Sequence, residues 1–492
     1  MAISIETFFI DPNGEGTLQA RIQQMVAQGI LAGRFRPGEK LPSSRSMAKH
    51  LGVSRITVTL AYTELVADDY LMSRGRSGFY VSDNAPDPPA FPAQRASATT
   101  VDWTRAIGQR FSPALGMNKP SNWAEYEYPF IYGQADPELF DGANWRMCAL
   151  QALGKRDFSS LTSDYFDGDD PQLIEFIARQ TLPRRGILAS PDEILVTMGA
   201  QNALWLTAQV LLTQRRLAAI EDPCYPALRS ILLQSRCQLA TVPVDGEGLK
   251  LDELPSETDV VFTTPSHQCP TTATMPMSRR QALLERAKAD DFLVVEDDYE
   301  FEMAFLKSPS PSLKSLDRDG RVIYVGSFSK SLFPGLRLGY LVGPAPFIRE
   351  ARALRASVLR HAPGHTQRTV SYFLSLGHYD ALVRRMARTY HKRRQVLDAA
   401  LNDLGIKVAG KGAYGGSSVW VEAPDGVDAG ALAKALQSDG VLIEPGSPFF
   451  AGANPPRQFF RLAYSSIPTE RIPKGVALIR KAIDAELAKS QC

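Results

Sequence analysis

Hydrophobic residues recur at helical spacing in three short stretches near the start of the chain. Thr17 can cap the first stretch and Gly33 can end it, and its apolar face comprises Leu18, Ile22, Met25, Val26 and Ile30. A second stretch starts at the Ser43-Ser44 pair and stops at Gly52. A third, capped by Ser54, has a buried stripe of Val58, Ala61, Tyr62 and Leu65. Residues 71–81 predict two short strands around a glycine turn, so we expect residues 17–81 to form a compact helical unit that ends in a hairpin.

The hydrophobic pattern changes after Val81. Residues 82–100 carry four prolines among alanines and small polar residues, which predicts a linker. From about Trp123, helical stretches alternate with short apolar runs at residues 193–197, 259–263, 292–296 and 321–325. This alternation predicts an α/β unit with a mostly parallel sheet. The expected organisation is a first domain at residues 1–81, a linker at 82–122 and a second domain at 123–492.

Composition and charge narrow the possible classes of protein. The 492 residues are 44% hydrophobic and 22% charged, which excludes a disordered or fibrous chain. The 55 basic and 53 acidic residues nearly cancel, so any affinity for nucleic acid has to come from a local patch. The five cysteines are scattered, with no C-x-x-C pair and no histidine at metal-ligand spacing, which favours a reducing compartment and no metal site. Since no run of about 18 apolar residues occurs, we expect a cytoplasmic protein that is not inserted in a membrane.

The second and third helices can form a helix-turn-helix. They are joined by Gly52-Val53-Ser54, and in this motif the second helix offers its first residues to the major groove of DNA. Basic side chains at the helix starts and in the hairpin suit phosphates and guanine edges, and these are Arg45, Lys49, Arg55, Arg74 and Arg76. From topology alone, the alternative is a three-helix protein-interaction domain with solvated arginines.

The stretch PGEKLPSSRSMAKHLGVSRITVTLAYTELVADDYLMSRGRSGFYVS resembles the winged-helix domain of GntR-type transcription regulators along its full length. The family pattern is PGxxLPSxRxLAxxLGVSRxTVxxAYxxL followed by a glycine-containing wing, and Met47 replaces the usual leucine. The resemblance implies that double-stranded operator DNA is a partner. It implies DNA contacts at Ser44, Arg45, Ser54, Arg55, Thr57, Arg74, Gly75 and Arg76.

In the second half of the chain, Lys330 comes just after a buried β run and between small hydroxyl residues. Burial disfavours the charged ammonium, so such a lysine needs a pairing acid or a covalent use, for example a Schiff base with an aldehyde. Ser327, Ser329 and Arg337 can supply hydroxyls and a guanidinium fork to a phosphate. Taken singly, Lys330 can also be an ordinary surface lysine.

Three further segments carry groups suited to a flat, phosphorylated ring. Asp297 ends an apolar strand, where doubly wound folds hold ligands, and it can pair with a pyridinium nitrogen while Tyr299 donates to a phenolic oxygen. The segment Gly199-Ala200-Gln201 opens a helix after a strand, and free amides at a helix start favour phosphate. Tyr225 can stack on the ring. Singly, these features are also typical of a solvated turn or a helix cap.

In their order, the segments G-A-Q, D-P-x-Y, P-S-H-Q-x-P-T, E-D-D-Y and S-x-S-K resemble fold-type I pyridoxal-phosphate aminotransferases, from about residue 123 onward. The resemblance implies pyridoxal 5'-phosphate as cofactor and Lys330 as the catalytic residue that forms the internal aldimine. It implies that Asp297 holds the ring nitrogen, Tyr299 the phenolic oxygen, and that Tyr225 stacks on the ring. The phosphate would be gathered by Gly199, Ala200, Gln201, Ser327, Ser329 and Arg337.

Arg461 lies in residues 460–464, which resemble the segment whose arginine grips a substrate carboxylate in these enzymes. Its bidentate fork also suits a sulfonate, so Arg461 is the expected ligand of the effector's acidic end. The alternative is an exposed arginine on an edge strand.

Three places depart from the aminotransferase pattern. Thr272 replaces the usual glycine of P-T-G. Residues 164–171 are altered around Tyr165, the candidate phosphate ligand from a neighbouring subunit. His267 and Gln268 lie where an asparagine often meets the cofactor oxygen, and which residue substitutes for it stays open; both can also be loop residues satisfied by the backbone.

A GntR-like winged helix, a linker and an aminotransferase-like domain in one chain resemble the MocR-type transcription regulators over nearly all 492 residues. The resemblance implies a homodimer, which can be domain-swapped, that senses a small primary-amine effector (an amino acid or an aminosulfonate) by forming an external aldimine. Two alternatives stay open. One is a working aminotransferase with a DNA-binding attachment, and the other is a DNA binder that uses the cofactor domain only for dimerisation.

Overall fold

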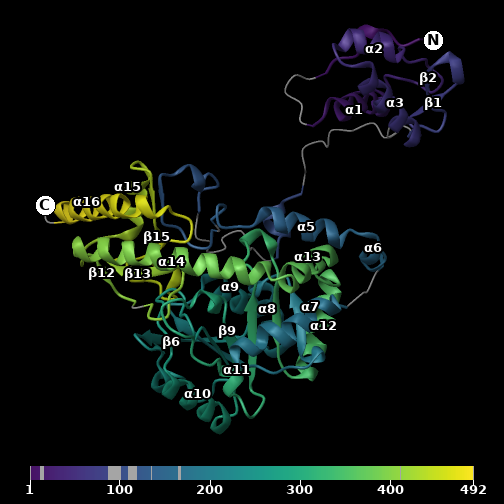
Figure 1. The fold of residues 1–492 in the computed structure, drawn as a ribbon. Helices are drawn as coiled ribbons and strands as arrows, with labels where there is room; N and C mark the ends of the chain where they lie inside the picture. Colours follow the sequence, from purple (N-terminus) through teal and green to yellow (C-terminus); the bar gives the residue numbers. More distant parts are fainter. Residues whose placement is uncertain are drawn as a thin grey trace. The chain divides into compact units, whose positions relative to one another are not determined.

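The computed structural model describes residues 2–10, 16–86, 101–108, 119–134, 136–163, 168–410 and 412–490. The chain divides into two compact units, Met1–Gln109 and Arg110–Cys492 (Figure 1). Tyr165, the candidate ligand from a neighbouring subunit, lies outside the described residues, as does the side chain of Arg76.

The N-terminal unit contains the three helices that the periodicity predicts. They are α1 (Leu18–Leu31), α2 (Ser44–Leu51) and α3 (Arg55–Ala67), followed by the short helix α4 (Trp103–Ala106). The side chains of the predicted caps Thr17, Ser43 and Ser54 each accept a backbone hydrogen bond in the first turn. Strands β1 (Leu71–Ser73) and β2 (Phe79–Val81) pair antiparallel and form the hairpin. The helix-turn-helix with a wing is therefore confirmed.

A single hydrophobic core holds this unit together. The predicted stripe of α3 is buried, and Ile22 and Val26 of α1 and Met47 of α2 pack in the same core. Gly52, which ends α2, has a φ of 67°, a left-handed conformation that glycine adopts without strain. This glycine sets the turn between the two helices of the motif.

The larger unit is built on an eight-stranded sheet with strand order β4-β11-β10-β9-β8-β5-β6-β7. Its strands are β4 (Ile194–Thr197), β5 (Leu217–Asp222), β6 (Gln238–Asp245), β7 (Gly248–Leu249), β8 (Val260–Thr263), β9 (Leu293–Asp297), β10 (Val322–Ser327) and β11 (Gly339–Val342). Five neighbouring strands, from β10 to β6, run parallel, whereas β11 is antiparallel to both β10 and β4. The predicted mostly parallel sheet is confirmed.

Strands β4, β8 and β10 are buried along their whole length, and since successive side chains point to opposite sides, both faces of the sheet are covered there. The helices of the larger unit are α5 (Gly142–Ala152), α6 (Lys155–Thr162), α7 (Pro171–Phe176), α8 (Ala200–Leu211), α9 (Pro226–Gln234), α10 (Met277–Ala289), α11 (Leu313–Leu316), α12 (Ala345–Leu359), α13 (Gly364–Ser375), α14 (His378–Asp403), α15 (Ala429–Gln437) and α16 (Ile472–Ser490). Leu195 and Ile323 share one core with α8, α9 and α12, while Val196 and Tyr324 share another with α7, α13 and α14.

A second, smaller sheet lies in the C-terminal part of the larger unit. Its order is β12-β13-β16-β15, with β12 (Lys407–Val408), β13 (Ser418–Glu422), β15 (Glu444–Pro445) and β16 (Phe459–Ala463). The strands β3 (Tyr128–Pro129) and β14 (Val441–Leu442) form a separate parallel pair. Figure 1 shows α14 and α16 side by side in this part of the unit. No helix in the described ranges is long and apolar enough to span a lipid bilayer.

Candidate functional site

A cavity of about 200 Å³ lies at the carboxyl ends of β9 and β10. Ligands of open α/β sheets bind at this edge. Ten of the predicted site residues line the cavity, and these are Ala200, Gln201, Tyr225, Asp297, Tyr299, Ser327, Ser329, Lys330, Arg337 and Arg461. The sequence analysis did not anticipate four other lining residues, Lys119, Tyr132, Cys269 and Pro334.

Lys330 projects into this cavity from the loop after β10. Its Nζ lies 4.0 Å from the centre of the Tyr132 ring. Gly133 lies close to this amine: its φ is 78°, a left-handed conformation that favours glycine, and a Cβ atom there would come within 2.8 Å of the Lys330 Nζ. Burial, together with the nearby cations Lys119 and Arg461, lowers the pKa of Lys330 to about 8, although the Glu300 carboxylate acts in the opposite direction. The lysine thus has a neutral, nucleophilic amine at a pH where an exposed lysine has almost none.

Asp297 is the last residue of β9 and is 8% exposed. Burial raises its pKa to about 7, and the neighbouring Asp298 carboxylate adds to this effect. Its Oδ1 is buried and accepts no hydrogen bond within the described part of the chain. A cationic partner such as a protonated ring nitrogen would satisfy this oxygen and stabilise the ionised carboxylate.

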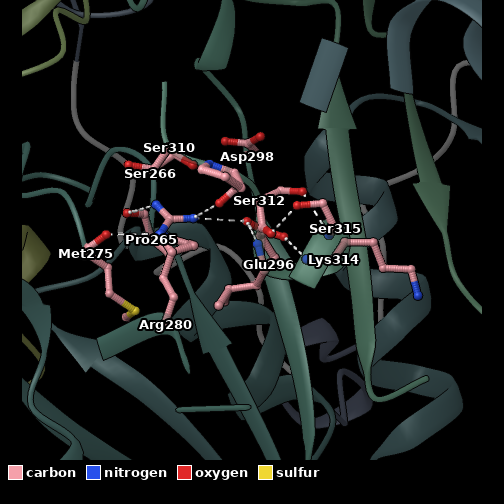
Figure 2. Close-up of polar contacts among 12 residues, drawn as sticks. Pro265, Ser266, Met275, Arg280, Glu296, Asp298, Ser310, Ser312, Lys314 and Ser315 are labelled. Atoms are coloured by element: carbon pink, nitrogen blue, oxygen red, sulfur yellow. Dashed lines mark hydrogen bonds and ion pairs between the residues drawn. The ribbon is translucent and has the colours of Figure 1, made fainter. Parts of the chain in front are cut away.

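Glu296, which precedes Asp297 on β9, is anchored in a buried polar network (Figure 2). Glu296 accepts hydrogen bonds of 2.9 Å from the backbone N–H groups of Leu313 and Lys314, at the start of α11. Arg280 has its Nη1 3.8 Å from Glu296 and donates to the carbonyl oxygens of Met275, Pro311 and Pro265. Because side chains alternate along a strand, these anchors hold the end of β9 while leaving Asp297 directed to the cavity.

Asp298 is held separately, by Arg185 and Tyr324. Arg185 Nε donates to Asp298 at 2.6 Å, and the Tyr324 hydroxyl donates to the same carboxylate at 2.9 Å. Ser266 and Ser310 bind the other guanidinium nitrogens of Arg185. The contacts of Glu296 and Asp298 therefore fix the backbone on either side of Asp297. Neither Glu296 nor Asp298 lines the cavity.

The groups predicted for a phosphate meet at the start of α8. Gly199 precedes the helix with a φ of 80°, and no side chain among the described residues caps this helix start. A Cβ at Gly199 would lie 3.4 Å from the Arg337 guanidinium and 3.7 Å from the Ser329 hydroxyl. Ser327 Oγ accepts a hydrogen bond of 3.2 Å from the backbone N–H of Ser329. Free amides, hydroxyls and a guanidinium that converge in this way suit a phosphate.

Cys269 reaches the cavity at the position that the sequence left open. Gln268 does not line the cavity, because its amide donates to Glu221 at 3.1 Å and to the carbonyl oxygen of Pro223 at 2.7 Å. His267 instead pairs with Glu300, at 3.3 Å. Burial raises the pKa of the Cys269 thiol to about 11, so it is a neutral, weak hydrogen-bond donor. The P-S-H-Q-x-P-T pattern contained this position, but a cysteine carries no specific signal.

Arg461 lies on β16, between β13 and β15, and is 2% exposed. The alternative of an exposed arginine on an edge strand is therefore wrong. Glu444, directly opposite on β15, accepts a hydrogen bond of 2.8 Å from Arg461 Nε, and its other oxygen lies 3.0 Å from Lys119 Nζ. The Arg461 guanidinium also lies 4.0 Å from the centre of the Tyr132 ring. We call Lys119, Glu444 and Arg461 the charged cluster.

Burial opposes charge at every member of the charged cluster. It lowers the pKa of Lys119, although the Glu444 carboxylate acts in the opposite direction. Burial also works against ionisation of Glu444, but Arg461 and Lys119 outweigh it and hold the pKa of that carboxyl below its usual range. The cluster therefore holds two cations and one anion, and it can accept one further negative charge.

The residues around the cavity fit pyridoxal phosphate. Besides Asp297 Oδ1, the Ser329 and Tyr132 hydroxyls are buried without a hydrogen-bond partner in the described ranges. The set comprises an acid for a ring nitrogen, an amine for an aldehyde, the aromatic side chain of Tyr225 and a phosphate-binding helix start. The burial of Tyr299 raises the pKa of its hydroxyl, so it stays protonated and can donate to a phenolic oxygen.

In the N-terminal unit, the predicted DNA-contacting residues lie on α2, on α3 and in the wing. Arg45, Arg55 and Arg74 are exposed, and Arg55 Nε lies 3.5 Å from Ser44 Oγ. Ser54 Oγ accepts the N–H of Thr57 at 3.1 Å and lies 2.8 Å from its hydroxyl. The Arg74 guanidinium lies 4.8 Å from the centre of the Tyr80 ring, and Gly75 next to it has a φ of 53°.

Two family models match the chain. The one described as bacterial regulatory proteins, gntR family, matches residues 18–81, and the one described as aminotransferase class I and II matches residues 140–479. The HTH-type transcriptional regulator TauR of Rhodobacter capsulatus is 58% identical over 484 residues, which cover 98% of this chain and 100% of that relative. The probable rhizopine catabolism regulatory protein MocR of Rhizobium meliloti is 29% identical over 96% of this chain and 95% of the relative.

Among solved structures, the chain is similar to a Pyrococcus horikoshii kynurenine aminotransferase in complex with PMP. The TM-score is 0.71 at 28% identity, over 78% of this chain and 98% of that one. Fold and matches together define a class of protein, in which a GntR-type winged helix is fused to a fold-type I aminotransferase domain. The chain belongs to the MocR-type subfamily of GntR transcription regulators, as the motifs predict, and it is a transcriptional regulator.

Proposed function

We propose that this regulator binds pyridoxal 5'-phosphate at Lys330 and senses a small primary amine, an amino acid or an aminosulfonate, in the same cavity. When bound, the cofactor supplies an aldehyde carbon that can exchange the amine of Lys330 for that of the effector. The observation that carries the proposal is that one cavity collects Lys330, Asp297, the phosphate-binding groups and Arg461. Selection of primary amines follows from that chemistry.

The protein contributes positioning and charge. Asp297 would hold the ring nitrogen, and the network beneath β9 keeps its carboxylate in place. Ser327, Ser329, Arg337 and the start of α8 would hold the phosphate, while Tyr225 and Tyr299 would contact the ring. Lys330 would keep a free amine in the cavity once an effector amine has taken its place, and that amine can retain or pass on a proton there.

The charged cluster would select the other end of the effector. Because it holds one more cation than anion, it favours an effector tail with a single negative charge, such as a carboxylate or a sulfonate. Arg461 is the ligand expected from the resemblance to aminotransferases, and Lys119 lies close enough to Glu444 to take part. An effector with an uncharged tail would add no negative charge to this cluster, so we expect it to bind more weakly.

For sensing to reach the operator, the effector must bind two states of the protein with different affinity. We propose that the two states differ in how a homodimer presents its winged helices. In the larger unit, α5 and α6 leave Met147, Leu150 and Phe158 exposed, together with Leu153 between the two helices. An apolar surface of this kind supports dimerisation through these helices. A Leu150→Glu variant would contradict this arrangement if it sediments as a dimer and its two subunits dissociate at the same protein concentration as those of the parent.

An active aminotransferase remains the second candidate, because the same cavity would support turnover. Lys330 has a depressed pKa and can act as the base of a proton shift as well as the cofactor's anchor. Fold and cofactor site do not separate recognition from turnover. The two candidate functions differ in their products, because only an active aminotransferase releases a keto or aldehyde product that accumulates with time.

The decisive experiment titrates purified protein with a panel of amino acids and aminosulfonates, with and without an operator duplex. The visible spectrum reports the cofactor, and a mobility shift reports the DNA. The proposal expects an amine with a monoanionic tail to change both, with no keto product. A spectral change with accumulating product and unchanged DNA affinity would favour the enzyme.

A Lys330→Ala variant tests whether the cofactor is attached to Lys330. We expect this variant to lose the visible absorbance band of the bound cofactor. A band that persists after dialysis would contradict the role of Lys330.

A further inference from the structure

Helix α3 has two apolar faces, although only one of them packs in the core. Val58, Ala61, Tyr62 and Leu65 are buried in the N-terminal unit. On the opposite side, Ile56 is 72% exposed and Leu60 is 49% exposed, and Thr59 and Thr63 lie on the same face at i+3 and i+7 from Ile56. A surface helix normally carries polar or charged residues on this side. We therefore expect the outward face of α3 to contact a binding partner.

The two threonines add to the apolar character of this face. Thr59 Oγ1 donates to the carbonyl oxygen of Arg55, and Thr63 Oγ1 donates to that of Thr59, both at 2.9 Å. Their hydroxyls are thus used within the helix. The methyl groups are left for contact with a partner. We call Ile56, Thr59, Leu60 and Thr63 the methyl face.

Exposed cationic side chains lie on α3 itself and on the elements next to it. Arg45 and Lys49 on α2 are exposed, as is Arg55 at the start of α3, and the wing adds Arg74. The acidic residue nearest along the helix, Glu64, is hydrogen-bonded to Gln23 of α1. An apolar face with cationic side chains on neighbouring elements fits a partner that combines a polyanionic backbone with exposed apolar groups.

DNA has this combination in its major groove. The phosphates form the frame, and the C5-methyl group of thymine is the apolar group at the base edges of the major groove. In a helix-turn-helix, the second helix enters that groove. We propose that the methyl face contacts the C5-methyl groups of thymine, so that the protein prefers operators with thymine at a few fixed positions. This inference rests on the proposed DNA-binding function and specifies what the recognition helix reads.

The test uses the full-length protein and a duplex that it selects from a random-sequence pool. Each thymine is replaced in turn by deoxyuridine, which removes only the methyl group. We expect about fivefold to tenfold weaker binding at a few clustered positions. Ile56→Ala and Leu60→Ala should weaken binding to the thymine duplex by a similar factor and abolish the difference between thymine and deoxyuridine. The salt dependence should not change, since methyl contacts release no counterions.

Leu18→Ala is the matched control, because Leu18 is 45% exposed on α1 of the same unit. This variant should keep the full thymine preference. Equal binding of every deoxyuridine duplex would overturn the inference while leaving DNA binding intact. So would Ile56→Ala and Leu60→Ala variants that bind the operator normally but change the sedimentation of the protein, because the methyl face would then belong to a protein contact. Failure to bind any duplex would instead contradict the proposed function.

Discussion

Glu444 accepts a hydrogen bond of 2.8 Å from Arg461, and both side chains are almost wholly buried. The residue expected to grip an anionic effector thus already has a carboxylate partner from the opposite strand. Lys119, 3.0 Å from the same carboxylate, supplies a second cation. The acidic end of an effector would therefore bind next to an ion pair that is already formed. Its negative charge would offset the excess positive charge of the charged cluster.

Replacing Glu444 by glutamine tests this cluster. The change removes the carboxylate that contacts both Arg461 and Lys119, so we expect the effector-free protein to lose about 3–5 kcal/mol of unfolding free energy. An amino acid or aminosulfonate with an acidic tail should restore more stability in this variant than in the parent, which a thermal-shift titration measures. The control is Glu422→Gln, which breaks the more exposed Lys407–Glu422 pair of the same sheet. It should cost at most about 1 kcal/mol. Equal effector shifts in Glu444→Gln and the parent would contradict this role.

The depressed pKa of Lys330 predicts how cofactor-free protein captures pyridoxal phosphate. Since the pKa is about 8, the fraction of neutral amine, and with it the capture rate, should rise with pH around pH 8. An exposed lysine would show this rise near its ordinary value of 10.5. Stopped-flow absorbance measures the rate. Lys119→Met removes a cation that lowers the pKa of Lys330, so its profile should shift to higher pH. Identical profiles for the variant and the parent would argue against this coupling.

The raised pKa of Asp297 makes the stability of the cofactor-free protein depend on pH. A buried acid with a pKa of about 7 holds its proton in the folded state over a range where the unfolded chain, at 3.8, has lost it. Its contribution to stability is thus largest below about pH 4 and is lost as the pH rises to about 7. Asparagine has no acidic proton, so Asp297→Asn should not show this loss of stability between about pH 4 and pH 7. We expect the variant to be more stable than the parent at pH 8 by urea denaturation, and similar to it at low pH.

Added cofactor should reverse that order, because only the parent has a carboxylate for the ring nitrogen. With saturating pyridoxal phosphate at pH 8, the parent should be the more stable protein. A variant that gains as much stability from the cofactor as the parent does would show that Asp297 does not contact the ring.

Thr272 predicts a stability difference between two small substitutions. Its φ is 62°, a left-handed conformation that a β-branched residue rarely adopts, and its hydroxyl is buried without a partner among the described residues. Thr272→Gly and Thr272→Ala both remove the methyl and the hydroxyl, but only glycine relieves the backbone strain. The glycine variant should be more stable than the alanine variant by about 1 kcal/mol. Equal midpoints in urea would show that the site is not strained.

Much of the molecule follows from local patterns in the chain. The three N-terminal helices and their caps were predictable because each has its own start signal, its own stop signal and an apolar stripe. The strands that end at Asp297 and Ser327 were predictable because fully buried parallel strands are short apolar runs. The order of the chemistry-bearing segments indicated the larger fold, and the family matches confirm it.

Tertiary structure decided which side chains share the cavity and in what state of charge. Lys119 and Cys269 carry no pattern of their own, yet the fold brings them to the cavity that Lys330 enters. The pairing of Glu444 with Arg461 depends on the register of β15 against β16, which no local spacing encodes. Burial likewise sets the pKa values of Lys330 and Asp297, because it depends on every segment packed around them. Local patterns along the chain are therefore enough to specify the helices, the strands and the class of protein, whereas the charge balance of the site exists only once distant segments meet.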